Sequence, residues 1–127
     1  MLDYLLDTGP LIRLLRGDEK TREHLARIGA EGNVFISVLT RTEVLCGMRD
    51  HESERTRRIL DGIPAFAVDS AVADLAGEFM RRFGQRGLSL ELTDAIIAAT
   101  SVRHDLLLVT YNRKDFPMPE LRLANTP

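Results

Sequence analysis

Four acidic residues stand at points where the chain changes from one predicted element to the next. Asp7 ends an apolar run that a Gly-Pro pair then breaks, and Glu43 lies in the first turn of a predicted helix. Asp94 lies in the first turn of another predicted helix, and Asp115 follows the apolar run 106–110. Carboxylates gathered in one cleft repel each other unless a cation lies between them. Oxygen ligands without His or Cys suit Mg²⁺, with Mn²⁺ as the alternative.

These acids point to phosphate chemistry. A divalent cation held by them would orient a phosphate group, lower the pKa of a bound water and stabilise the leaving oxygen, as phosphodiester hydrolysis requires. Each acid also has a structural explanation. Glu43 could complete a capping box with Thr40, Asp94 could complement its helix dipole, and the other two could be turn residues. The structural explanation is simpler for any single acid, and the metal site is more economical for all four.

The elements that would position these acids alternate between strands and helices. Apolar and β-branched runs predict strands that end at Asp7 or cover 34–38, 65–68, 106–110 and 121–123. Apolar residues three and four apart predict helices over 11–15, 19–28, 40–48, 51–63, 70–83 and 93–103. This order predicts an α/β fold, a single domain over 1–127 with a mostly parallel central sheet flanked by helices. The carboxyl ends of such strands meet at one edge, where ligands collect.

The composition is that of an ordinary folded domain. The 127 residues are 44% hydrophobic and 28% charged, and no run approaches the roughly 18 apolar residues of a membrane span. Asp3 and Asp7 interrupt the apolar part of the N-terminus, unlike a signal peptide. Cys46 is the sole cysteine, which suits a reducing cytosol, and we expect it to be a small buried helix residue. We therefore predict a cytoplasmic protein with no membrane partner.

Three other enzyme classes share parts of these motifs. Asp7-Thr8-Gly9 is the catalytic tripeptide of aspartic proteases, but those enzymes are all-β and this chain has several helical periodicities. A phospho-accepting receiver domain would need a lysine that ends a strand, and Lys114 lies within the predicted turn 112–115. A phosphatase of the haloacid dehalogenase type would need a second aspartate where Gly9 stands.

Four sequence blocks occur in a fixed order over nearly the whole chain. They are Leu5–Thr8, Ile36–Gly47, Leu92–Thr100 and Leu108–Phe116, the last followed by Leu121–Leu123. The chain resembles, in these blocks, the PIN-domain ribonucleases, specifically the VapC-type toxins of bacterial toxin–antitoxin pairs. The resemblance implies catalytic and metal-ligating roles for Asp7, Glu43, Asp94 and Asp115.

The resemblance also implies supporting roles for Thr8, Thr110 and Asn112 through hydrogen bonds to the carboxylates or to a bound water. In some family members the fourth acid stands where this chain has Asn112, and in others three residues on, at Asp115. Which of the two fills the fourth position stays open at this point.

The activity that the resemblance implies is a Mg²⁺-dependent endoribonuclease, using one or two metal ions. It also implies a cognate antitoxin whose tail covers the acidic cleft, and self-association as a homodimer or a hetero-oligomer with the antitoxin. The alternative is a catalytically silent PIN-fold module that binds RNA or sequesters the antitoxin. Arginines near the acids in sequence are candidates for contacts with RNA phosphates; they are Arg13, Arg16, Arg41 and Arg113.

Overall fold

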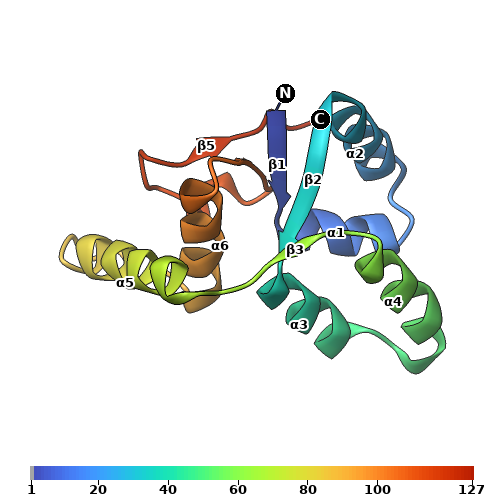
Figure 1. Ribbon diagram of the computed structural model, residues 1–127, viewed down its shortest axis with the longest axis horizontal. Coiled ribbons are helices and arrows are strands. Elements are labelled where there is room, and N and C mark those ends of the chain that lie inside the picture. Colours follow the sequence, from blue (N-terminus) through green and yellow to red (C-terminus); the bar gives the residue numbers. More distant parts are fainter. Residues whose placement is uncertain (1) are drawn as a thin grey trace.

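The protein is described by a computed structural model over residues 2–127, whose sheet has five strands in the order β3-β2-β1-β4-β5 (Figure 1). All four strand pairings are parallel. The strands are β1 (Leu2–Leu6), β2 (Gly32–Ser37), β3 (Ala65–Phe66), β4 (Leu107–Val109) and β5 (Arg122–Leu123). The predicted α/β fold with a parallel central sheet is confirmed.

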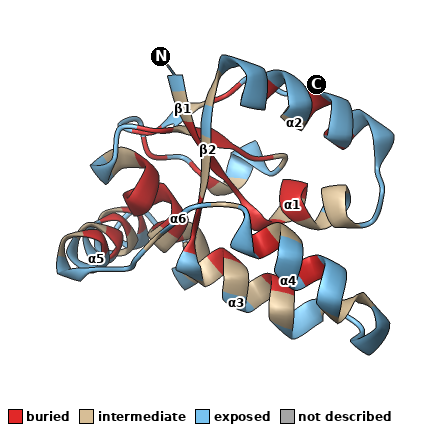
Figure 2. Ribbon diagram, turned by 45° about the vertical axis from the view of Figure 1, so that its right-hand side comes forward, coloured by how far each residue is buried: buried red, intermediate tan, exposed pale blue. Residues whose placement is uncertain are grey.

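Helices cover both faces of this sheet (Figures 1 and 2). They are α1 (Thr8–Leu15), α2 (Glu19–Glu31), α3 (Val38–Gly47), α4 (Ser53–Asp61), α5 (Ser70–Gly84) and α6 (Leu92–Arg103), with 3₁₀ turns η1 (Asp50–Glu52) and η2 (Arg113–Asp115). Successive side chains of a strand point to opposite faces. Leu5 accordingly packs in the core formed with α5 and α6, whereas Leu6 packs in the core formed with α1, α2, α3 and α4.

Helix α3 begins earlier than predicted. Ser37 is its N-cap, and the Ser37 hydroxyl accepts a hydrogen bond from the backbone N–H of Leu39 at 3.1 Å. Thr40 and Glu43 therefore do not form the capping box that was the structural explanation of Glu43, and the placement of Glu43 in the first turn is wrong. Thr40 is buried within the helix, and Glu43 is the sixth helical residue. Ser37, the buried last residue of β2, caps the helix ahead of its predicted start.

Two smaller predictions also fail. The second helix, predicted over 19–28, extends to Glu31 and has Gly32 as its C-cap, where a Cβ would overlap the Leu2 carbonyl of the paired strand. The backbone of the neighbouring strand thus requires glycine at this position. Cys46 is exposed rather than buried, because α3 buries the face that carries Thr40 and Val44. Within residues 2–127, no helix combines the length and apolar character that crossing a bilayer requires.

Candidate active site

Asp7 joins the central strand to the first helix. Its Oδ1 atom accepts from the backbone N–H of Thr8 at 2.9 Å, as the N-cap of α1, and its Oδ2 atom accepts from the Thr110 hydroxyl at 2.8 Å. Burial raises the pKa of Asp7, and the nearby carboxylates of Glu43 and Asp115 raise it further. The hydrogen bonds from Thr110 and Thr8 oppose this rise by stabilising the ionised form. The predicted supporting position of Thr110 is thus observed.

A hydrogen bond from Thr8, the residue after Asp7, holds Glu43 in place. The Thr8 hydroxyl donates to Glu43 Oε1 at 2.7 Å and lies 3.2 Å from the hydroxyl oxygen of Thr40. Thr8 and Thr40 are buried, so this contact fixes the spacing between α1 and α3. The arrangement brings a second carboxylate to the carboxyl edge of the sheet.

Asp94 and Asp115 complete the acidic cluster. The pKa of Asp94 is raised to about 6, first by burial and then by the negative charges of Asp7, Asp115, Glu43 and Glu91. Such electrostatic effects require the carboxylates to lie near each other. The structure therefore brings together all four acids that the sequence singled out.

Asp115, one of the two candidates for the fourth position, lies near the other acids. The charge of Asp115 acts on both Asp7 and Asp94. Asn112 is exposed, and its backbone N–H donates to the Thr110 hydroxyl at 3.1 Å. This main-chain bond holds the same Thr110 hydroxyl that donates to Asp7.

The donor set fits a hard divalent cation. All four acids offer oxygen atoms. Their like charges add to the effect of burial in raising the pKa values of Asp7 and Asp94, and a cation would relieve that repulsion. Within residues 2–127, no three or more His, Cys, Asp or Glu residues are already arranged to hold a metal ion. Binding would draw the carboxylates closer together. Glu91 was missed at the sequence level; its signal is an acid three residues before Asp94.

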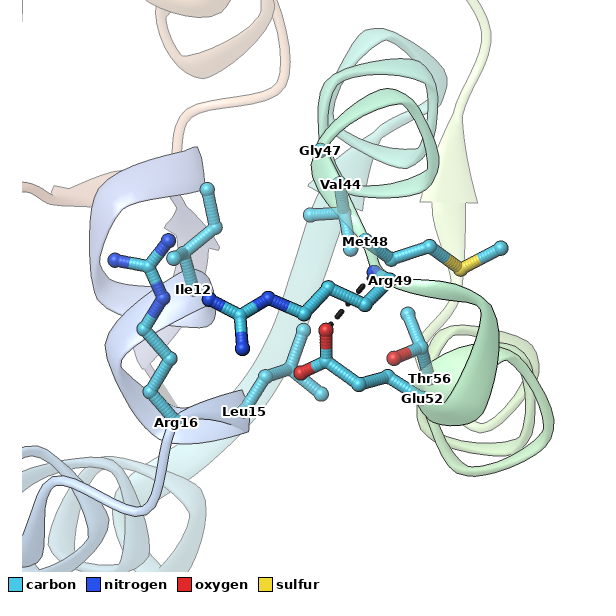
Figure 3. A pocket seen from close by; sticks show the side chains of 9 residues that line it. All are labelled: Ile12, Leu15, Arg16, Val44, Gly47, Met48, Arg49, Glu52 and Thr56. Atoms are coloured by element: carbon cyan, nitrogen blue, oxygen red, sulfur yellow. Dashed lines mark hydrogen bonds between the residues drawn. The ribbon is translucent and has the colours of Figure 1, made fainter.

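The four arginines expected near RNA have different surroundings. Arg41 pairs with Asp61 at 2.9 Å, Arg113 donates to the Ala124 carbonyl at 2.8 Å, and the guanidinium carbon of Arg13 lies 4.9 Å from the centroid of the Tyr111 ring. Arg16 lines a groove between α1, α3 and α4, with a volume of about 410 Å³ (Figure 3). Contact of these arginines with RNA stays a prediction.

The groove lies between α1 and α3, farther along both helices than Thr8 and Glu43. Ile12 lies one helical turn after Thr8, and Gly47 lies one turn after Glu43. Figure 3 shows the Arg49 side chain extending across the groove toward Ile12. None of the four acids lines the groove, so it is separate from the acidic cluster.

Replacing Thr110 with Val tests the hydrogen bond to Asp7 directly. Valine keeps the shape but removes the donor, so the pKa of Asp7 is expected to rise further above its ordinary value. A buried acceptor without its partner costs about 1–3 kcal/mol of the free energy of unfolding at pH 7. NMR titration of the Asp7 carboxyl and urea unfolding measure the two effects.

The matched control is Thr21→Val, because Thr21 also donates to an aspartate, Asp18, at 2.6 Å on helix α2. This variant is expected to leave the Asp7 titration unchanged. An Asp7 carboxyl that titrates alike in Thr110→Val and in the wild type would contradict the assigned bond.

Fold and site together define a small α/β domain with a parallel sheet of order β3-β2-β1-β4-β5 and carboxylates at its carboxyl edge. The family model of the PIN domain matches residues 4–118. Ribonuclease VapC10 of Mycobacterium tuberculosis is 35% identical over 91% of this chain and 87% of its own length. The chain therefore belongs to the PIN-domain family, and the resemblance predicted from the four sequence blocks is confirmed.

Solved structures agree with this assignment. A chain of a toxin-antitoxin complex from Klebsiella pneumoniae is 30% identical, with a TM-score of 0.80, over 98% of this chain and 99% of that chain. VapBC2 from Rickettsia felis, solved bound to a DNA fragment from their promoter, has a TM-score of 0.88 at 20% identity, covering 99% of this chain and 100% of that chain. The second likeness establishes the fold alone.

Proposed function

We propose that this protein is a metal-dependent endoribonuclease that acts as the toxin of a toxin–antitoxin pair. The observation that carries the proposal is the closeness of four carboxylates. The pKa of Asp94 is raised to about 6, first by burial and then by the charges of Asp7, Asp115 and Glu43. A full-length relative with the name of a ribonuclease supports RNA as the substrate. The charge and oxygen donors of the site support Mg²⁺, or Mn²⁺ in its place.

The residues of the chain have separable roles in this proposal. Asp7, Glu43, Asp94 and Asp115 would hold the cation, which when bound supplies activation of water and stabilisation of charge on the phosphate. The Thr110 hydroxyl fixes the carboxylate of Asp7 by donating a hydrogen bond to it, and the Thr8 hydroxyl does the same for Glu43. Each carboxylate keeps lone pairs for a ligand, because an ionised carboxylate accepts about four hydrogen bonds.

The proposal includes a protein partner. Relatives of the same fold were solved as toxin-antitoxin complexes, which supports an antitoxin that binds this chain and covers its acidic cleft. A homodimer, a hetero-oligomer with the antitoxin and a cytoplasmic location belong to the same proposal. The alternative is a silent PIN-fold module that binds RNA or sequesters the antitoxin. It is less well supported, because all four acids are present and close together.

Cleavage of total cellular RNA tests the proposal. The wild type is expected to cut RNA in Mg²⁺ and to stop when a chelator is added. Asp7→Asn is expected to lose at least about 100-fold in rate, because even outer-shell partners of metal ligands are worth 10–100-fold. The control is Asp74→Asn, an exposed acid on α5, which is expected to cut like the wild type.

Two outcomes would contradict this function. Equal cleavage by the wild type and Asp7→Asn would show that the acids are not the active site. RNA binding without cleavage, by folded protein free of antitoxin and supplied with Mg²⁺ or Mn²⁺, would favour the silent binding module.

A further inference from the structure

We propose that His24 and Tyr111 form a clamp that positions the segment 110–115, and with it Thr110 and Asp115, at the acidic site. His24 received no role from the sequence. This inference rests on the proposed nuclease function, because it adds positioning residues to that site. We call the pair the His24–Tyr111 clamp.

The clamp is a partly buried hydrogen-bonded pair between distant parts of the chain. His24 Nδ1 lies 2.8 Å from the Tyr111 hydroxyl oxygen, and His24 Nε2 lies 3.0 Å from the carbonyl oxygen of Asn125. A carbonyl only accepts, so Nε2 must carry the proton that it donates. In the neutral imidazole, Nδ1 then accepts, and the Tyr111 hydroxyl donates to it. His24 is 4% exposed, so its side of this bond is shielded from water.

Tyr111 connects the clamp to the acids. It directly follows Thr110, whose hydroxyl donates to Asp7, and it precedes Asp115 by four residues. The guanidinium carbon of Arg13, in the last turn of α1, lies 4.9 Å from the centroid of the Tyr111 ring. Contacts with Arg13 of α1 and His24 of α2 thus hold Tyr111 next to Thr110.

The C-terminal segment strengthens the same attachment. Arg113 donates to the Ala124 carbonyl at 2.8 Å, and the next carbonyl, that of Asn125, accepts from His24. The segment 110–115 therefore has attachments to helix α2, to helix α1 and to the chain after β5. Beyond it, Phe116 is buried in the core.

Electrostatic repulsion gives the clamp its function. Asp115 shares the site with Asp7 and Asp94, and these like charges favour movement of Asp115 away from the cluster. Segment 110–115 lies after the last residue of β4, so the sheet ladder does not hold it. Hydrogen bonds of Tyr111 and Arg113 oppose the repulsion and keep Asp115 close enough to share a cation.

Single-atom changes test the clamp. Tyr111→Phe removes the hydroxyl and keeps the ring for Arg13. It is expected to raise the Mg²⁺ concentration for half-maximal cleavage by about 10-fold, the lower end of the range for outer-shell partners, with KM for RNA unchanged. The matched control is Tyr4→Phe, which removes a phenol bonded to Glu31 at 3.0 Å and is expected to leave the Mg²⁺ requirement unchanged.

Two substitutions of His24 separate its nitrogens. His24→Asn places an acceptor near the position of Nδ1, so it is expected to retain most of the Mg²⁺ affinity. His24→Gln places its amide near the position of Nε2, so it is expected to lose as much Mg²⁺ affinity as Tyr111→Phe. The Mg²⁺ affinity of the Tyr111→Phe/His24→Gln double variant is expected to be no lower than that of either single variant, because both substitutions remove the same hydrogen bond. Calorimetric titration of Mg²⁺ into protein without RNA gives the same comparison independently of cleavage.

The two proposals fail separately. Absence of cleavage by the wild type overturns the proposed function, while the calorimetric titration still tests the clamp. Wild-type cleavage with an unchanged Mg²⁺ requirement in Tyr111→Phe overturns the clamp alone. A lowered Tm in Tyr111→Phe with wild-type Mg²⁺ affinity also overturns it, because that result assigns the pair a purely structural role.

Discussion

The Asp94→Asn variant is expected to lose RNA cleavage and yet to be more stable than the wild type at neutral pH without cation. Asp94 is a proposed metal ligand, so the loss in rate is expected to be at least about 100-fold. Its carboxylate is also desolvated and faces the charges of Asp7, Asp115, Glu43 and Glu91, which raises its pKa to about 6. Asparagine removes one charge from this cluster and thereby removes part of the repulsion.

The pH dependence of this effect has a defined direction. The pKa of Asp94 is about 6 in the folded protein and 3.8 in the unfolded chain, so the folded state binds more protons between these values. The contribution of Asp94 to the stability of the wild type is therefore most favourable below about pH 4. It becomes less favourable as the pH rises through 6. Asp94→Asn lacks this decrease. Because Asp94 is only partly buried and water screens its charge, the gain in Tm at pH 8 is expected to be roughly 2–4 °C.

Thermal unfolding from pH 4 to pH 8, with and without Mg²⁺, measures this prediction. Mg²⁺ is expected to raise the Tm of the wild type, because a ligand of the native state stabilises it, and to raise that of Asp94→Asn much less. Asp74→Asn on the exposed face of α5 is the control and is expected to follow the wild type throughout. A variant less stable than the wild type at pH 8 without cation would contradict the proposed repulsion.

Replacing Phe79 with Ala is expected to produce the largest loss of stability. Phe79 on α5 is fully buried in the core formed with α6, Leu5 and Leu108. Removing a buried phenyl ring loses its transfer free energy and leaves a cavity, which together cost about 3–5 kcal/mol. That is a large fraction of the roughly 5–15 kcal/mol that stabilises a typical domain. For a domain of this size, the Tm is expected to fall by about 10–20 °C.

Urea unfolding of Phe79→Ala against Leu92→Ala checks the origin of this loss. Leu92 is 60% exposed at the start of α6, so its truncation is expected to change the free energy of unfolding by less than about 0.5 kcal/mol. Similar losses in the two variants would show that burial does not distinguish these positions.

Local pattern in the sequence was enough to predict the order of the elements. Continuous apolar runs identified the strands, and three- and four-residue spacing identified the helices, including the buried Phe79 and Phe83 of α5. The same patterns placed Asp7 and Asp94 at element ends. These features depend on residues a few positions apart, which a single sequence displays directly.

Only the tertiary structure decided how the acids meet and what supports them. The bond between Thr8 and Glu43 spans 35 positions, that between His24 and Tyr111 spans 87, and that between Thr110 and Asp7 spans 103. No local periodicity encodes such pairs, because they arise from the order of strands in the sheet and the packing of helices on it. The exposure of Cys46 likewise depends on which helix face meets the core. The sequence by itself thus determined the family, the order of the elements and the acidic residues, and the packing of distant segments determined which side chains hold those acids in place.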